Sequence, residues 1–182
     1  MPLSVAFYGD NLIHPGLKLG TSYLLGSKVK TKVHKWKGLE SKRGNKVKQI
    51  DYTTDLNFSF YNHPNNHSGL LLGLGATRLR TNTRKNRSLG WSAEVSYLRR
   101  VYNVSTYELG EDGSLQEISL GGNNGVVLSI SPSFGKVIKP QVYGRNIRIY
   151  GRPILQVLTY NHAWSPNAAF EFGVTLNPVK KQ

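Results

Sequence analysis

The sequence lacks cysteine, long apolar runs and an even balance of charge. Its 182 residues include no Cys, which excludes a disulfide scaffold and a cysteine-based zinc site. No apolar run reaches the roughly 18 residues of a membrane-spanning helix. Only 10 Asp and Glu stand against 24 Lys and Arg, so the formal net charge is +14. Such an excess of positive charge predicts an anionic partner or surface.

A signal peptide is also missing from the sequence. Residues 1–10, MPLSVAFYGD, contain no basic segment followed by a long apolar stretch. We therefore expect either a protein that is not exported or a mature form from which the signal peptide is absent.

What dominates the sequence is strict alternation of apolar and polar residues, the pattern of a β-strand with two different faces. In residues 169–176, Phe170, Phe172 and Val174 point one way, whereas Glu171 and Gly173 point the other. Turn-forming residues separate similar runs, which predicts consecutive antiparallel hairpins. The expected strands are residues 3–8, 16–27, 48–61, 69–82, 88–109, 113–135, 146–160 and 168–177.

The length of these runs and the nature of their polar face favour a membrane barrel. Several runs exceed 11 residues, although strands of soluble proteins average about 5–6. The polar face is mostly Gly and Ser, with isolated charges of both signs that suit a narrow barrel interior, namely Lys18, Asp55, Glu94, Arg152 and Glu171. Aromatic residues near strand ends fit interfacial girdles: Tyr23, Tyr52, Tyr61, Trp91, Tyr97, Tyr160 and Trp164. We predict one all-β domain over residues 1–182, an antiparallel up-and-down barrel of about eight strands that is transmembrane.

This pattern resembles that of the small, about eight-stranded outer-membrane barrels of Gram-negative bacteria, over nearly the whole chain. The resemblance implies an outer-membrane location in the bacterial cell envelope, membrane lipid around the barrel and termini on the periplasmic side. The alternative is a soluble closed barrel of the lipocalin kind, in which Phe58, Phe60, Phe170 and Phe172 surround a ligand cavity.

Positive charge gathers at one end of the predicted barrel. With eight strands, every second connection and both termini share an end, and that end receives most of the Lys and Arg residues. It includes a long basic connection at 28–48, the residues Arg78, Arg80, Lys136 and Arg148, and a basic C-terminal tail at 177–182. The candidate binding residues on this basic rim are Lys28, Lys30, Lys32, Lys35, Lys37, Lys42, Arg43, Lys46, Lys48, Arg84, Lys85 and Arg87. Expected partners are anionic lipid, cell-wall polymer or an envelope protein, and nucleic acid under the soluble alternative.

Sequence motifs for catalysis are weak. His63 and His67 share a loop that offers no third metal ligand. Asp51 and Asp55 lie about 13 Å apart along one strand, too far for a carboxylate pair. We therefore expect no catalytic residue, no metal and no cofactor.

One acyl-transfer constellation remains, formed by His162, Ser165 and Glu171. It resembles small outer-membrane lipid A deacylases only in outline, because those carry His-x-Ser on one outward face of a strand. We predict a non-enzymatic structural, accessory or partner-binding barrel of the envelope, acting either alone or as a subunit of a larger complex. The alternatives are a soluble basic barrel that binds nucleic acid or another polyanion and, third, a lipid A deacylase-like hydrolase.

Overall fold

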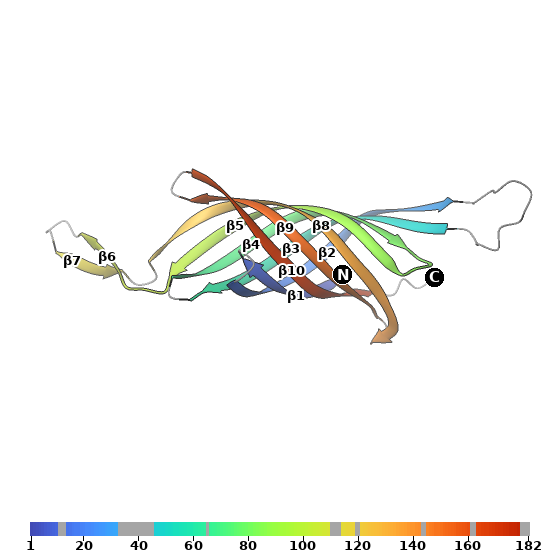
Figure 1. Ribbon diagram of the computed structural model, residues 1–182, viewed down its shortest axis with the longest axis horizontal. Helices are drawn as coiled ribbons and strands as arrows, with labels where there is room; N and C mark the ends of the chain where they lie inside the picture. Colours follow the sequence, from blue (N-terminus) through green and yellow to red (C-terminus); the bar gives the residue numbers. More distant parts are fainter. Residues whose placement is uncertain are drawn as a thin grey trace, which may run out of the picture.

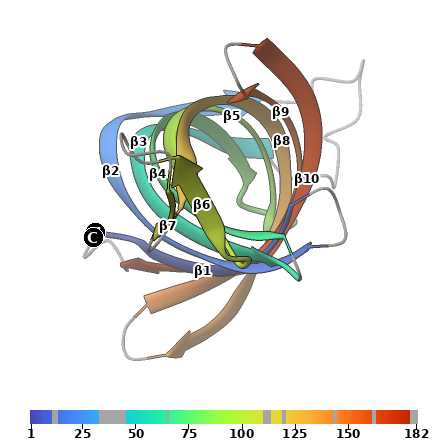
Figure 2. The ribbon, with the colours of Figure 1, turned by 90° about the vertical axis from the view of Figure 1, so that its left-hand side faces the viewer.

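A computed structural model describes residues 1–10, 14–32, 46–64, 66–109, 114–118, 121–142, 145–160 and 163–178. Eight long strands close into a barrel in the order β1-β10-β9-β8-β5-β4-β3-β2, and β6 and β7 form a separate two-stranded sheet (Figures 1 and 2). The strands are β1 (Leu3–Asp10), β2 (His14–Lys32), β3 (Lys46–His63), β4 (His67–Asn82), β5 (Arg87–Tyr102), β6 (Thr106–Leu109), β7 (Leu115–Ile118), β8 (Gly122–Val142), β9 (Arg145–Tyr160) and β10 (Ala163–Pro178).

Every neighbouring pair in the barrel is antiparallel, and β1 closes the ring against β10 with Phe7 opposite Phe172. The predicted up-and-down barrel of about eight strands is therefore confirmed. Within the described residues, no helix is long and apolar enough to cross a membrane.

Because apolar and polar residues alternate along each strand, the barrel has an apolar exterior and a mostly polar interior. Phe172 is 54% exposed, whereas its neighbour Glu171 is 1% exposed and points into the barrel. The soluble alternative, with Phe58, Phe60, Phe170 and Phe172 around an internal cavity, is wrong, because these rings all lie on the outside. An exterior of this kind is unfavourable in water and suits contact with lipid.

The height of the apolar exterior also matches a membrane. On β5 the outward residues are uncharged from Leu89 to Tyr97, and on β8 they are uncharged from Val126 to Phe134. Each of these stretches is about as long as the 9–11 residues that a tilted strand needs to cross a bilayer. We call this zone the apolar belt.

Chemically different groups extend the barrel at its two ends (Figure 1). The basic end carries the β2–β3, β4–β5 and β8–β9 connections, and β2 and β3 pair there as far as Lys32 opposite Lys46. The arm end carries β6 and β7, which project from the wall as a hairpin.

The structure corrects the predicted strand boundaries in three places. The runs predicted at 88–109 and 113–135 are each interrupted. The pairing of β5 with β4 stops at Tyr102 opposite His67, and the chain beyond Tyr102 forms the separate β6–β7 hairpin. The basic connection predicted at 28–48 is paired strand through Lys32 and again from Lys46. The C-terminal tail predicted at 177–182 begins within β10, which continues to Pro178.

A charge placed on the apolar belt tests this orientation. We expect Phe172→Arg to lower the free energy of unfolding in lipid vesicles by about 2–4 kcal/mol, because Phe172 lies near the middle of β10. Trp164→Arg is the matched control, since Trp164 is 57% exposed on the same face near the end of the strand and should cost only about 0–1 kcal/mol. The measurement is a urea titration followed by the heat-dependent gel mobility of the folded barrel. Equal costs for the two variants would show that Phe172 does not face a bilayer core.

Candidate functional site

A cluster of buried charges joins strands from different parts of the barrel wall. Lys18 on β2 places its Nζ atom 3.1 Å from Oε2 of Glu94 on β5 and 3.4 Å from Oε2 of Glu171 on β10. Arg152 on β9 contacts the same Glu171 oxygen at 3.8 Å. Two cations and two carboxylates therefore balance one another inside the barrel.

Neutral donors complete the surroundings of the two carboxylates. Asn57 Nδ2 donates to Glu94 Oε2 at 2.7 Å, and Ser96 Oγ donates to Glu94 Oε1 at 3.0 Å. The Tyr150 hydroxyl donates to Glu171 Oε1 at 2.6 Å. Buried charge is tolerated when ion pairs and hydrogen bonds replace water, as they do here.

Two further interior groups lie toward the basic end. Asp55 accepts hydrogen bonds from the hydroxyl groups of Thr53 and Thr77. Arg148 donates from Nε to Ser88 at 2.8 Å and from Nη2 to Ser133 at 2.7 Å. Arg148 lies at the basic end, as the order of the strands predicts, but it is only 6% exposed and points into the barrel.

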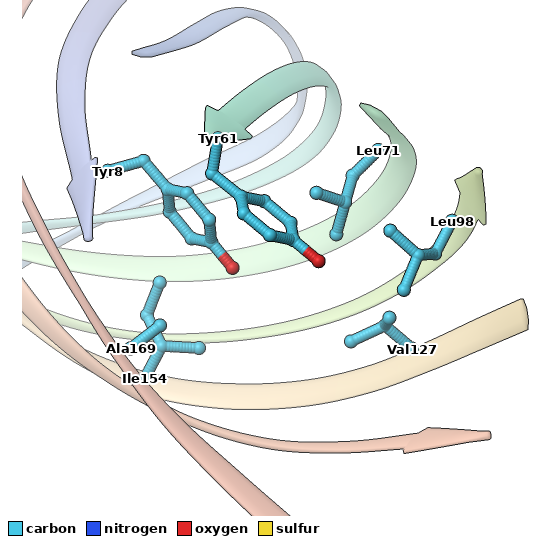
Figure 3. Packing of buried hydrophobic residues seen from close by; sticks show 7 residues of the cluster. All are labelled: Tyr8, Tyr61, Leu71, Leu98, Val127, Ile154 and Ala169. Atoms are coloured by element: carbon cyan, nitrogen blue, oxygen red, sulfur yellow. The ribbon is translucent and has the colours of Figure 1, made fainter. Parts of the chain in front are cut away.

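Toward the arm end, apolar side chains fill the interior (Figure 3). The cluster consists of Tyr8, Tyr61, Leu71, Leu98, Val127, Ile154 and Ala169. Tyr61 is 2% exposed, so its expected place in an outer girdle was wrong. A small pocket of about 10 Å³ lies between this cluster and the charged groups and has room for about one water molecule. A filled interior of this kind provides no wide channel.

The outer surface at the basic end carries a row of cations directly beyond the apolar belt. These residues, here called the basic belt, are Lys28, Lys30, Lys48, Arg78, Arg80, Arg87 and Lys136. They lie on five adjoining strands, β2, β3, β4, β5 and β8. On β9, β10 and β1, the described outward side chains at this end are apolar, namely Ile147, Ile149, Val174, Leu176 and Leu3. The basic belt therefore covers one side of the barrel.

Cations of the basic belt lie beside aromatic residues on the neighbouring strands. Arg78 lies between Tyr52 and Trp91. Lys28 holds its Nζ atom 6.0 Å from the centre of the Tyr52 ring. Cations beside Trp and Tyr are typical of the boundary between membrane and water.

The structure places the predicted rim residues unevenly. Lys28 and Lys30 lie on β2, Lys46 and Lys48 on β3, Arg84 and Lys85 in the exposed β4–β5 turn, and Arg87 at the start of β5. For Lys32 and Lys46 only the backbone position is described. The predicted Lys35, Lys37, Lys42 and Arg43 lie outside the described residues.

A histidine group at the arm end is larger than the sequence indicated. The His14 ring stacks on His63 with centroids 3.7 Å apart, and His63 lies 5.3 Å from His67. His67 lies beyond the apolar belt, and burial, with the nearby Arg100, lowers its pKa. Strand pairing brings His14 to this loop, and no local spacing could have shown it. No group of His, Cys, Asp or Glu among the described residues has the arrangement of a metal site.

The acyl-transfer constellation is not assembled. Ser165 is exposed near the start of β10, whereas the Glu171 carboxylate is held in the interior by Lys18 and Arg152. Six residues along one strand separate Ser165 from Glu171 by about 20 Å. His162 lies outside the described residues.

No family model and no curated protein sequence matches this chain. Among solved structures, the chain is similar to the outer membrane enzyme PagL, with 9% identity, a TM-score of 0.48 and coverage of 98% of this chain and 100% of that one. It is also similar to Neisserial surface protein A, with 8% identity, a TM-score of 0.43 and coverage of 96% and 91%. A third similar structure is the β domain of the Bordetella autotransporter BrkA, with 12% identity, a TM-score of 0.41 and coverage of 95% and 68%. These are likenesses of fold.

The buried ion cluster should contribute strongly to stability. We expect Lys18→Met to lower the free energy of unfolding by about 3–5 kcal/mol, because it leaves Glu94 without its cation in the interior. Adding Glu94→Gln should recover part of this loss, since Glu171 still contacts Arg152. The exposed Lys30→Met on the same strand is the control and should stay within about 0.5 kcal/mol of the parent. Equal stability of the Lys18 and Lys30 variants in a urea titration would show that the cluster contributes nothing.

Proposed function

We propose that this chain is a non-enzymatic outer-membrane barrel that serves as a structural or accessory protein of the bacterial envelope. In this role it binds anionic lipid headgroups through its basic belt. The termini and the basic belt share one end, and barrels of this kind keep their termini in the periplasm. The basic belt then faces the phosphate groups of the inner leaflet.

The position of the basic belt carries this proposal. Its cations lie next to the apolar belt on five strands, at the level where headgroups meet the hydrocarbon core. Among the described residues, no carboxylate lies within ion-pair distance of Arg78, Arg80, Arg87 or Lys136. Arg87 and Lys136 are directly opposite each other. Like charges in this arrangement repel, and an anion between them removes the repulsion.

The filled interior supports the non-enzymatic part of the proposal. Ion-paired charges and apolar side chains occupy the space that a transported or reacting molecule would need. What the protein offers to partners is therefore its outside. We infer that the rim residues predicted within 33–45 add to the attraction for anions at the same end.

Neutralising the basic belt tests the proposal. We expect Arg78→Gln, Arg80→Gln, Arg87→Gln and Lys136→Gln, combined in one protein, to remove most of the preference for phosphatidylglycerol over phosphatidylcholine. Each cation near a membrane surface contributes about 1 kcal/mol to binding of anionic lipid. The measurement is native mass spectrometry of the folded barrel after exposure to an equimolar mixture of the two lipids, at low and at high salt.

A shortened protein distinguishes the contribution of the basic belt to lipid preference from that of the β2–β3 connection. Lys32 pairs with Lys46, so an Asn-Gly turn that replaces residues 33–45 should close the hairpin without a change in register. We expect this protein to keep most of the preference, because the basic belt is intact. A combined Gln variant that still prefers phosphatidylglycerol as strongly as the parent would refute the role of the basic belt.

A further inference from the structure

The lipid-facing surface is hollowed beside the basic belt. An open groove of about 410 Å³ lies over β4, β5 and β8, on the outside of the barrel. Its apolar lining comes from Leu74, Ala76, Ala93, Val95 and Leu128.

The groove arises because small side chains meet across the strands. Ala76 lies opposite Ala93, so two neighbouring outward positions carry only a methyl group. On the arm side the next row contains Leu74, Val95 and Leu128, which form a wall. On the basic side the next row contains Arg78 opposite Trp91.

We infer that this groove binds one acyl chain of an anionic lipid whose phosphate is held by Arg78 and Arg80. This inference rests on the proposed function and makes it specific to one site. Arg78 lies two residues, about 7 Å, beyond Ala76 along β4, which is the order of headgroup and chain in a lipid. Guanidinium groups bind phosphate through paired hydrogen bonds, and the Trp91 indole lies at the same level.

Charge favours a lipid over a second copy of the barrel as the occupant. Two copies in one membrane share their orientation, so their basic belts lie at the same level. A symmetric dimer through this groove would bring Arg78 and Arg80 of both copies together, which is repulsive. An anionic lipid matches both the apolar groove and the adjoining cations.

Trp91 provides a reporter at the edge of the groove. The protein has three Trp, so Trp36→Phe and Trp164→Phe leave Trp91 as the single fluorophore. This protein is reconstituted into phosphatidylcholine vesicles that contain an equal small fraction of brominated phosphatidylglycerol or brominated phosphatidylcholine. We expect several-fold stronger quenching of Trp91 by the anionic brominated lipid.

Filling the groove is the decisive variant. Ala76→Leu with Ala93→Leu should lower the quenching ratio of the two lipids several-fold, to the level that the basic belt alone supports, whereas Ala168→Leu, on the outward face of β10, should leave the ratio unchanged. Arg78→Gln with Arg80→Gln should also lower the ratio while leaving the groove open. Gel mobility of the unheated protein shows that each variant is folded, and Ala93→Val alone replaces the double variant if it is not.

The outcomes separate this site from the basic belt in general. A preference that the filled groove leaves undiminished overturns the acyl site and leaves lipid binding by the basic belt standing. A parent protein without any preference overturns the proposed function as well. Energy transfer between labelled barrels that the filled groove abolishes would identify a second copy as the occupant and overturn the lipid site.

Discussion

Lys18 joins three strands of the barrel wall, because its ammonium group contacts Glu94 of β5 and Glu171 of β10 from its own position on β2. Arg152 adds a fourth strand through the same Glu171. In a membrane, moving an apolar side chain from the lipid into the protein interior stabilises the fold only slightly, because lipid is as apolar as a protein core. Backbone hydrogen bonds between neighbouring strands close the wall, and the ion pairs across the interior add contacts between strands that are not neighbours. The neutral donors around both carboxylates make this possible in a space with almost no room for water.

The packed interior determines where the protein can interact. A barrel of eight strands is narrow, and here polar groups fill one part while apolar side chains fill the other. The chemically distinctive surfaces are consequently outside: the apolar belt, the basic belt beyond it and the groove between Leu74 and Arg78. Because the basic belt spans five strands and leaves β9, β10 and β1 apolar, the barrel presents different sides to the surrounding lipid.

The arm end has the opposite character. From Val101 to Gly125, the part of the chain at this end, the sequence has no Lys or Arg, and β6 and β7 in this segment expose Tyr107, Leu109 and Leu115. The two ends of the molecule thus differ in charge as well as in shape. Such an asymmetry along the barrel axis is what a fixed orientation in a membrane requires.

Much of the fold follows from the period of two, because alternation assigns each side chain to a face without reference to the rest of the chain. The strand count and the outward position of Phe172 could be predicted in this way. The inward cluster of Leu71, Leu98, Val127 and Ile154 could not be predicted in this way. Within each strand, a single apolar residue on the polar face gives no sign that it meets similar residues from other strands. Tyr61 was misplaced because residue type was given more weight than parity.

Contacts between distant strands escape sequence reasoning altogether. The stacking of His14 on His63 and the pairing of Ala76 with Ala93 depend on register, which only the closed sheet determines. The basic belt was accessible in outline, because strand parity sorts the connections into two ends. Its one-sided form required the three-dimensional order of the strands.

The central claim is that the apolar face of each strand meets lipid, and single-cysteine labelling tests it most directly. The chain contains no Cys, so one spin label at a time can be introduced from 168 to 176 on β10 without background. In vesicles, we expect even-numbered positions to collide with oxygen, which concentrates in the bilayer, and odd-numbered positions to be shielded from both oxygen and a water-soluble nickel complex. Collision of the even-numbered positions with the nickel complex along the whole strand would place this face in water and contradict the account.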